Sequence, residues 1–491
     1  MTLAFEGHVT ADDRARDPYL ELPFEVGAGA VRISVGYRHD AGSVLDLGLL
    51  DPSVGPFPSA TGLRGWSGGA RDHVEVGLDR ATPGYLPGPL PSGTWRVLLG
   101  LAAVAPGGCS YRVEVEVDVE VDEAAEARGG PTYDGRAHPA AAHASPAHGA
   151  HHTGPRWYRG DLQSHTHHSD ARGSLEDLRS AALARGLEYL AVTDHNTVSH
   201  HAPIDRFATD ALLWLPSTEV TTYRGHANVW GVDGAVDFRV RSDADVAALV
   251  AHVHARGGLF SVNHPKAAPG CIGCDWEYPI PTDLDALEAW QGPWAYRNWE
   301  SLERYDRLLR AGRRVTLVGG SDRHQPPGPD TDPEPLRVGS PTTWLQLAAR
   351  TRADALTALR EGRATVSEGP EGPFLEIEVS GSGMGSIVAA APTLRCRARI
   401  RGARGERLRW IGADGPIREV AIDDDAFEDA CSLAAGGAFV RAEVVADASL
   451  DARRAALRSS GAERRRAAGI EETAVFARPY RLALSNPVYV R

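Results

Sequence analysis

The chain has 491 residues, of which 42% are hydrophobic and 24% are charged, a composition typical of a globular protein with about three domains. Its formal net charge of −13 argues against a broad nucleic-acid-binding surface. A small anionic substrate remains compatible with that charge, because bound cations dominate their local field. The sequence starts without a signal peptide and has no apolar stretch long enough to span a membrane. We therefore expect a cytoplasmic protein that acts on a small molecule, with its oligomeric state left open.

The five cysteines are too few and too scattered for the disulfide framework of a small secreted domain. Cys271 and Cys274 have the spacing of zinc knuckles and redox motifs, but no second pair completes a four-cysteine site. We expect two ordinary loop thiols here, with a disulfide or a metal site as the minor alternative.

Residues 1–122 are predicted to form an N-terminal β-sandwich. Segments such as 111–121 alternate apolar and polar residues with a period of two, and turns rich in Pro and Gly separate the strands. No ionisable residues cluster here, which indicates a packing, binding or covering role. Residues 123–156 are rich in Ala, Gly, Pro and His without periodicity, which predicts a linker whose histidines form no specific site.

Residues 157–370 alternate short apolar strands with capped helices, which predicts an α/β domain with a parallel sheet, open or closed into a barrel. One helix begins after Ser174, and another spans 242–256 with one apolar face. Residues 371–491 return to strands and predict a second, C-terminal β-sandwich. Within it, the Arg-rich segment 451–472 is most simply a solvated helical insertion, with anion binding as a minor alternative.

Polar clusters follow the apolar strands of the middle domain one after another. Since the carboxyl ends of parallel strands meet at one rim, these clusters are expected to converge there. Any one of them alone could equally be a core pair or a surface residue. The clusters lie at Gly160–Asp170, Thr193–Asn196, Glu219 with His226, Asn263–Lys266 and Gly319–His324.

The donors in these clusters are imidazoles and carboxylates without a thiolate, a set that suits Zn, Mn or Fe in a catalytic site. Sites of this kind that share a carboxylate hold two cations ~3.5–4 Å apart, with a hydroxide between them for in-line attack. The sequence therefore predicts a hydrolytic metal centre.

The motifs Gly-Asp-Leu-x-x-His-Thr-x-x-Ser-Asp, Thr-Asp-His-Asn, Glu-(x)6-His, Asn-His-Pro and Gly-Ser-Asp-x-His, in that order, resemble the polymerase-and-histidinol-phosphatase (PHP) superfamily of metallohydrolases. The flanking β domains resemble the carbaryl-hydrolase-like (CehA/McbA-type) branch of this superfamily. This resemblance rests on the motifs Arg64-Gly-Trp-Ser-Gly, Ala81-Thr-Pro-Gly-Tyr and Leu484-Ser-Asn-Pro-Val-Tyr. The resemblance implies a distorted (β/α)7 barrel over 157–370 between the two sandwiches, carrying two or three divalent metal ions.

The resemblance also implies a set of ligands for three metals. The first would be held by His165, Glu219 and Asp322 with position 163 as a fourth ligand, the second by Glu219, His226 and His264, and the third by Asp170, His195 and His324. By the same resemblance, Glu219 bridges two metals, and the residues closest to the chemistry are Glu219, His195, His324 and Asp322. Candidate substrate-binding residues beside the ligands are Lys266, Arg323, Arg224 and His168, although each could equally be a solvated neighbour. Asp194 and His168 are further candidates to orient ligand imidazoles.

Gln163 departs from the family pattern, which has His-x-His where this chain has Gln163-Ser164-His165. An amide oxygen is a poorer ligand than imidazole for a borderline cation, so a weaker first metal is expected. Three outcomes are open: Gln163 binds the metal through its oxygen, His167 substitutes for it, or the first metal binds weakly.

These features predict a metal-dependent hydrolase, most simply a phosphoesterase that attacks a small phosphorylated substrate with a metal-bridging hydroxide. The alternative keeps the site and changes the substrate to an aryl ester or carbamate, with Trp290, Trp294 and Tyr296 as an apolar wall, although packing in the core explains these aromatics equally well. A non-catalytic binding protein with a degenerate site is the third hypothesis, and only Gln163 supports it.

Overall fold

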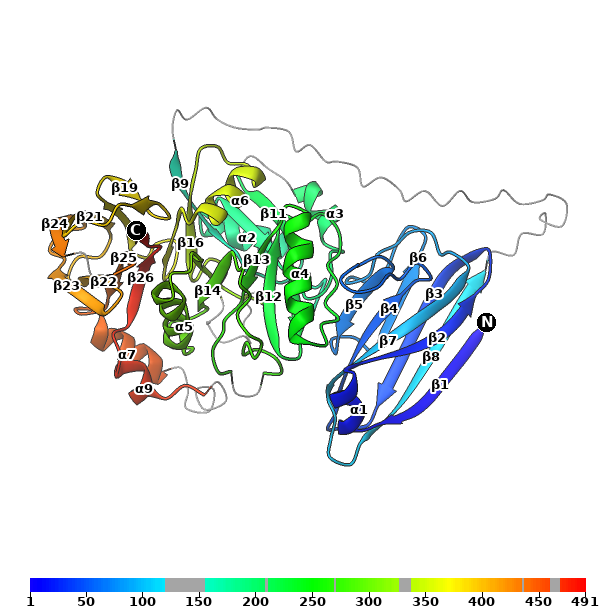
Figure 1. Cartoon of the computed structure of the whole chain (residues 1–491). Coiled ribbons are helices and arrows are strands. Elements are labelled where there is room, and N and C mark those ends of the chain that lie inside the picture. The colour runs from blue at the N-terminus through cyan, green and yellow to red at the C-terminus, as the bar shows by residue number, and fades with distance from the viewer. Residues whose placement is uncertain (120–154, 208–210, 269–270, 326–336, 435–436, 460–468) are drawn as a thin grey trace.

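The computed structural model describes residues 1–491 except 120–154, 208–210, 269–270, 326–336, 435–436 and 460–468. Most of the expected linker and part of the Arg-rich segment lie outside the described residues. The described chain is mixed α/β and is arranged in sequence order, with N-terminal sheets at one end, an α/β region in the middle and C-terminal strands at the other end (Figure 1).

The N-terminal region consists of two antiparallel four-stranded sheets that share one apolar core. One sheet has the order β1 (Thr2–Val9), β8 (Cys109–Val119), β3 (Ala30–His39) and β6 (His73–Gly77). The other has the order β2 (Tyr19–Val26), β7 (Gly93–Ala103), β4 (Val44–Leu50) and β5 (Leu63–Gly68), and helix α1 (Ala11–Arg16) precedes β2. Alternate residues of β8, such as Val113, Val115 and Val117, are buried, as the period of two predicts.

The middle region is a curved sheet covered by helices. Its strands run in the order β15 (Thr316–Gly320), β14 (Ala286–Gln291), β13 (Leu259–Val262), β12 (Gly225–Trp230), β11 (Leu213–Thr222), β10 (Tyr189–Val192), β9 (Arg156–Asp161), β16 (Thr342–Leu347) and β17 (Ala364–Ser367). The helices are α2 (Leu175–Ala184), α3 (His201–Ile204), α4 (Asp243–Ala255), α5 (Asn298–Arg310) and α6 (Arg352–Glu361). Ser174 and Ser242 cap α2 and α4 through reciprocal hydrogen bonds, which confirms the predicted helix starts.

The sheet of the middle region is mixed, whereas the alternation of strands and helices predicted a parallel one. Strands β9, β10 and β11 are parallel, but β12 is antiparallel to β11 and to β13. The reason is local: β11 and β12 are joined by the short turn Tyr223-Arg224, and a parallel pair would need a crossover of a dozen or more residues.

No hydrogen-bonded ladder closes these strands into a barrel within the described residues. The two ends approach each other without pairing, since the hydroxyl of Thr343 on β16 accepts from Gly319 N at 2.9 Å and donates to Gly319 O at 2.7 Å on β15. The distorted (β/α)7 barrel therefore stays a prediction, and what the structure has is a curled open sheet.

The same sheet continues into the C-terminal region. From β17 it runs through β26 (Arg481–Ser485), β25 (Phe439–Val445) and β22 (Arg407–Gly412) to β23 (Gly415–Ala421). A second sheet has the order β19 (Ser382–Gly383), β18 (Phe374–Val379), β21 (Thr393–Arg401) and β24 (Ala426–Ala434), and the apolar residues between the two sheets belong to the core of the middle region. The remaining elements are β20 (Ile387–Val388), β27 (Val488–Val490), α7 (Leu450–Ser459) and α9 (Glu472–Phe476).

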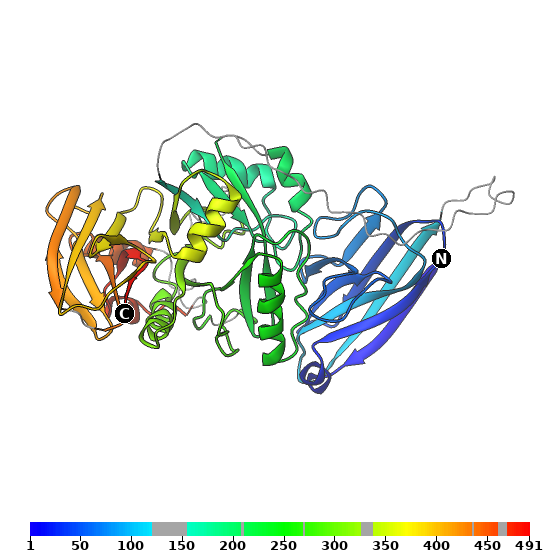
Figure 2. The same cartoon turned by 45° about the horizontal axis from the view of Figure 1, so that its top comes forward.

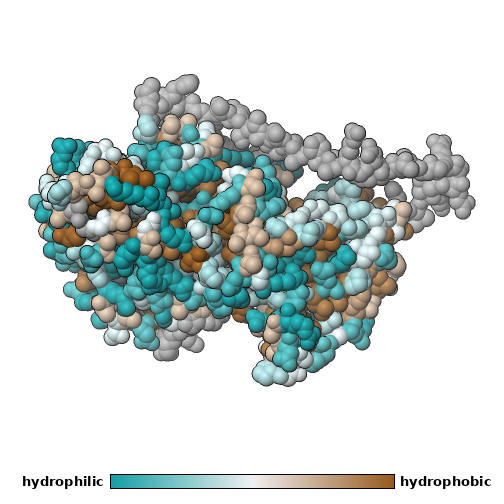
Figure 3. All heavy atoms as spheres, viewed as in Figure 1, coloured by the Kyte–Doolittle hydropathy of each residue, from teal (hydrophilic) through white to brown (hydrophobic). Residues whose placement is uncertain are grey.

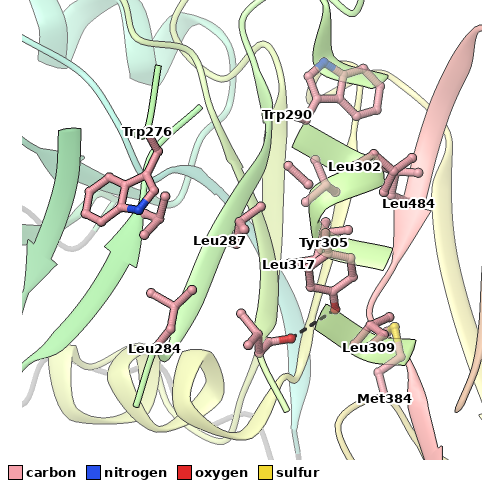
Figure 4. Close-up of a cluster of buried hydrophobic side chains, with 14 of the residues drawn as sticks. Trp276, Leu284, Leu287, Trp290, Leu302, Tyr305, Leu309, Leu317, Met384 and Leu484 are labelled. Carbon is pink, nitrogen blue, oxygen red and sulfur yellow. Dashed lines mark hydrogen bonds between the residues drawn. The ribbon is translucent and has the colours of Figure 1, made fainter. Parts of the chain in front are cut away.

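Helix α5 joins the middle and C-terminal regions through its apolar face. Leu302, Tyr305 and Leu309 recur at helical spacing and pack with Leu317 of β15 and Leu484 of β26, as Figure 4 shows. The hydroxyl of Tyr305 donates to the carbonyl of Val315 at 3.0 Å. This shared core holds the strand ends of the middle region in fixed positions.

Cys271 and Cys274 form a disulfide, whereas the sequence favoured two free thiols. Their Cα atoms are 5.6 Å apart, a separation that suits a disulfide and that the spacing of the motif alone does not determine. Among the described residues, no helix is both long enough and apolar enough to cross a membrane.

Candidate metal centre

Five stretches of the middle region deliver their polar and ionisable side chains to one place. Gln163 and His165 follow β9, His195 follows β10, Glu219 and His226 belong to the hairpin β11–β12, His264 follows β13, and Asp322 and His324 follow β15. The structure thus brings together the strand ends that the sequence pointed to, because the strands that carry them lie next to one another in the sheet.

The ligand atoms gather into three overlapping groups, and within each group all of them lie within 4.8 Å of one another. The groups are His165 with Glu219 and Asp322, Glu219 with His226 and His264, and His165 with His195 and His324. The first two coincide with triads that the resemblance implied, and the third contains His165 where Asp170 was expected. Asp170 lies at the edge of this third group, since its Oδ1 is 3.6 Å from His195 Nε2 and 3.4 Å from His324 Nε2.

Glu219 stands between the groups, and its two oxygens face different imidazoles. Oε1 is 3.4 Å from His226 Nδ1 and 3.5 Å from His264 Nε2. Oε2 is 3.3 Å from His165 Nε2 and from His195 Nδ1. A carboxylate in this position can bind one cation with each oxygen.

The site also contains buried polar atoms without a hydrogen-bond partner. They are His165 Nδ1, Glu219 Oε2, His226 Nε2 and Gln163 Oε1. Such atoms are costly in a folded protein unless something absent from the chain itself satisfies them. Because two of them are imidazole nitrogens and two are carboxylate or amide oxygens, the residues fit a divalent cation such as Zn, Mn or Fe.

Gln163 occupies the space between two carboxylates. Its Nε2 donates to Glu219 Oε1 at 3.1 Å and to Asp322 Oδ1 at 3.2 Å. A half-turn of the amide would exchange its nitrogen and oxygen and aim the oxygen at the centre. His167 does not take its place, since the His167 Nδ1 faces the carbonyl of Gly173 at 3.4 Å.

The site combines ionised carboxylates with imidazoles whose pKa values are shifted in opposite directions, since burial lowers the pKa of His195 to about 4. Burial raises the pKa of Glu219, but the facing histidines outweigh it and hold that pKa well below its usual range. Burial lowers the pKa of His264, and its contacts with Glu219 and Glu288 then raise it to about 9. In His165, likewise, Asp322 and Glu219 overcome burial and raise the pKa well above its usual value. Protons on His165 and His264 therefore occupy positions where cations would balance the same carboxylates.

The backbone is strained at three of the strand ends. Asn196, His264 and Asp322 have φ angles of 54°, 28° and 53°, which non-glycine residues rarely adopt. Strain of this kind persists only where the surrounding structure enforces it, and it collects at functional sites.

Several residues that the sequence did not single out as functional hold the ligands in place. Asn263 donates to Glu219 Oε1 at 2.8 Å, and Gln291 donates to Asp322 Oδ2 at 2.8 Å. Thr221 shares a 2.6 Å hydrogen bond with His195 Nδ1. Of these three, only Asn263 could have been recognised from the sequence, because it belongs to the Asn-His-Pro motif, whereas Gln291 and Thr221 are ordinary strand residues.

Three of the four candidate substrate-binding residues are hydrogen-bonded or ion-paired to other side chains, and the side chain of the fourth, Arg323, is buried. Lys266 is buried, and its ammonium group donates to Gln291 Oε1 and Asn298 Oδ1, each at 2.7 Å. The Arg323 side chain is buried, the Arg224 side chain pairs with Asp243 at 3.3 Å, and His168 Nδ1 bonds to Ser199 at 2.7 Å.

Asp194 and two of the tryptophans are likewise engaged by other parts of the protein. Asp194 accepts hydrogen bonds from Thr166 and Ser169, each at 2.7 Å, so it shapes the loop that follows β9. Trp290 and Trp294 are fully buried in the core, which leaves no exposed face for a substrate.

A cavity of about 810 Å³ opens over the centre. One side of its wall contains His195, His226, His264, Asp322 and His324. The other side comes from the N-terminal sheets and contains Val44, Asp46, Trp66, Ala102 and residues 67–71, which form the end of β5 and the turn after it. The N-terminal region therefore forms part of the wall, in agreement with the covering role that was among those expected from its sequence.

The N-terminal sheets lie directly against the middle region, as Figures 2 and 3 show. Arg71 donates to the carbonyls of His167 and Ser169, and Gly84 N donates to Ser199 Oγ at 2.9 Å. The ring of Trp66 packs 4.6 Å from that of Phe238. These contacts fix the N-terminal wall of the cavity relative to the ligands.

Comparisons with known proteins give low similarity. No protein-family model matches the chain, and no curated protein matches it. One similar solved structure is a two-domain protein from Bacteroides vulgatus ATCC 8482 containing a predicted PHP-like metal-dependent phosphoesterase, at 16% identity and a TM-score of 0.38, covering 59% of this chain and 90% of that one. Another is an amidohydrolase from Chromobacterium violaceum with bound sulfate and no metal, at 15% identity and a TM-score of 0.25, covering 34% of this chain and 87% of that one.

Proposed function

We propose that the protein is a metal-dependent hydrolase, and that its substrate is a small phosphorylated molecule. The observation that carries the proposal is Glu219, whose two oxygens face separate groups of imidazoles in a site with four unsatisfied buried donor and acceptor atoms. A structural ion pair would not need a carboxylate shared between groups.

Residues of the three groups would hold two or three divalent cations such as Zn, Mn or Fe. When bound, these cations would lower the pKa of water and neutralise charge on the substrate. The surrounding residues have separate tasks in this proposal. Asn263 and Gln291 keep the carboxylates of Glu219 and Asp322 oriented by donating to one oxygen of each. Thr221 fixes the ring of His195 by its hydrogen bond to Nδ1.

Two positively charged side chains in the cavity wall support a phosphorylated substrate. Arg71 and Arg172 both line the cavity, the first from the N-terminal sheets and the second from the loop after β9. Arginine side chains beside a metal site favour anionic oxygens, and the guanidinium group matches the geometry of a phosphate. Lys266 and Arg323 are buried and are not among the residues that line the cavity, so their role in substrate binding stays a prediction.

An ester or carbamate with an apolar substituent is the second candidate, and the mouth of the cavity favours it. Val44 and Ile272 line the cavity and are 39% and 40% exposed, although they are apolar. They come from opposite sides, the N-terminal sheets and the disulfide loop. An apolar group on the substrate would bury both side chains and gain free energy.

The test is metal analysis of the purified protein combined with a substrate panel. The panel contains phosphomonoesters, phosphodiesters, nucleotides, aryl esters and carbamates, each with added Mn or Zn. Turnover of phosphate esters supports the first candidate, and turnover of acyl esters or carbamates alone supports the second. Absence of both turnover and bound metal would contradict the proposal and favour a non-catalytic binding protein.

A further inference from the structure

The N-terminal sheets contribute one carboxyl group to the wall of the cavity. Asp46 lies on β4 and lines the same cavity as His195, His226 and His324, although it is distant from them in the sequence. Asp46 is only 8% exposed, so its carboxyl group is largely buried. A buried carboxyl group in a folded protein is normally paired with a cation.

Asp46 has no such partner. In the part of the chain that the structure describes, it forms no ion pair with an arginine, lysine or histidine, and its one side-chain hydrogen bond comes from Tyr223, whose hydroxyl donates to Oδ2 at 2.6 Å. The ionisable groups around it are Tyr223, Tyr19, Tyr37, His39 and Asp170. Of these, only His39 can carry a positive charge.

Tyr223 ties the position of Asp46 to the candidate metal centre. It stands at the tip of the β11–β12 hairpin, whose strands carry Glu219 and His226. Its hydroxyl reaches Asp46 only because Gly100 has no side chain, since a Cβ atom there would lie 2.0 Å from that hydroxyl. A single short hairpin therefore links Asp46 to two of the ligands, Glu219 and His226.

The other oxygen of Asp46 faces glycines. A Cβ atom at Gly68 or Gly69 would lie 3.7 Å or 3.6 Å from Oδ1, and both glycines line the cavity. A side chain at either position would cover this oxygen. Oδ2 thus holds the carboxyl group through Tyr223, and Oδ1 lies beside two glycines that line the cavity.

We propose that Asp46 is the general acid of the reaction, which protonates the leaving oxygen of the substrate; this inference rests on the proposed hydrolase function. The oxygen of a water molecule forms a bond to phosphorus, and the bond from phosphorus to the leaving oxygen breaks. The leaving oxygen keeps the electron pair and takes the proton of Asp46. One proton of the water stays on the product phosphate, and the other returns through solvent to the Asp46 carboxylate.

The protonation state of Asp46 agrees with this role. Burial raises the pKa of its carboxyl group to about 6, against the opposing effect of the hydrogen bond from Tyr223. The group therefore keeps its proton in part of the molecules near neutral pH, as a proton donor must.

The test compares Asp46→Asn with the wild type on two substrates that differ in leaving group. 4-Nitrophenyl phosphate has a leaving group that departs without protonation, whereas butyl phosphate needs a proton on its leaving oxygen. We expect Asp46→Asn to lower kcat on butyl phosphate by ~100-fold or more and on 4-nitrophenyl phosphate by less than ~3-fold. If the panel shows an acyl ester hydrolase, the corresponding 4-nitrophenyl and butyl esters replace them.

Asp79→Asn is the matched control, because it removes one negative charge from an exposed position of the same region. It should leave both rates unchanged, and the metal content should be equal in all three proteins. An equal loss on both substrates, or a rise in KM without a change in kcat, would overturn the general-acid role and indicate substrate binding or support instead. If the wild type turns over no substrate in the panel, the proposed function itself fails.

Tyr223→Phe gives a second test that keeps the carboxyl group. Without the donated hydrogen bond the pKa of Asp46 rises, so the fall in kcat with increasing pH should move to higher pH on butyl phosphate. An unchanged pH profile in this variant would also overturn the inference.

Discussion

Gln163 and Glu219 face each other across the candidate metal centre, with Nε2 of the amide 3.1 Å from Oε1 of the carboxylate. The same nitrogen is 3.2 Å from Oδ1 of Asp322. The amide thus stabilises two carboxylates that would otherwise repel each other, and it does so from the position where the motif that the sequence resembles has an imidazole. A cation that enters this group must displace or rotate it.

Replacing Gln163 by histidine is expected to increase the occupancy of the first metal. Imidazole is a stronger ligand than an amide for borderline cations, and the change removes the donor that competes for the two carboxylates. Metal content after dialysis measures the effect. Gln163→Ala is the control, because it removes the amide without adding a ligand, and equal metal content in the wild type and Gln163→His would contradict the prediction.

Glu219→Ala should abolish activity and lower the metal content. Loss of a residue that orients a ligand typically costs 10–100-fold in metal affinity or activity, so loss of the shared ligand is expected to cost more than ~100-fold. Kinetics on whichever substrate the panel identifies, together with metal analysis, check this. Glu277→Ala, at an exposed position, should behave as the wild type. Retained activity in Glu219→Ala would show that this carboxylate does not bridge.

Gln291→Ala should weaken metal binding by ~10–100-fold without abolishing it. Gln291 donates to Asp322 and is itself held by the ammonium group of Lys266, so its loss frees the ligand and removes one of the hydrogen-bond acceptors of a buried ammonium group. Metal titration followed by calorimetry gives the affinity. Gln346→Ala, on β16, is the control, and equal affinities in all three proteins would exclude an orienting role for Gln291.

Gly100→Ala should destabilise the contact between the N-terminal sheets and the middle region by ~1–3 kcal/mol, because the added methyl group collides with the hydroxyl of Tyr223. Thermal unfolding measures the change. Gly107→Ala is the control, since a Cβ atom there meets no other atom within 4 Å. Combining Gly100→Ala with Tyr223→Phe should recover part of the loss, and failure to recover any of it would show that the hydroxyl is not the obstacle.

Asp46 should make the metal-free protein less stable as the pH rises. Its pKa is raised from 3.8 to about 6 in the folded state, so the folded state binds the proton more tightly than the unfolded state does. This contribution to stability is complete below about pH 4 and is lost as the pH rises through 6, by at most ~3 kcal/mol. The free energy of unfolding, measured from pH 4 to 8, should fall less steeply over this window in Asp46→Asn than in the wild type. Parallel curves would contradict the raised pKa.

Local signals in the sequence account for the elements and for the residues at their ends. The capping residues Ser174 and Ser242 begin helices where expected, and the polar clusters after β9, β10, β13 and β15 meet at one place. This is possible because periodicity, capping and turn chemistry act over a few residues. The antiparallel direction of β12 was missed although its cause is local, because the two-residue connection Tyr223-Arg224 permits only an antiparallel pair with β11.

Long-range contacts were decided only by the tertiary structure. Gln291 supports Asp322 from a neighbouring strand, and Asp46 belongs to the cavity wall although it lies in a separate sheet. Neither position is marked by a local sequence pattern. The sequence by itself determined which side chains could form a metal centre, because ligands must be of certain chemical types. Which of them share Glu219, and what closes the cavity above them, depends on how strands far apart in the chain pack, and that packing is determined by the shared core.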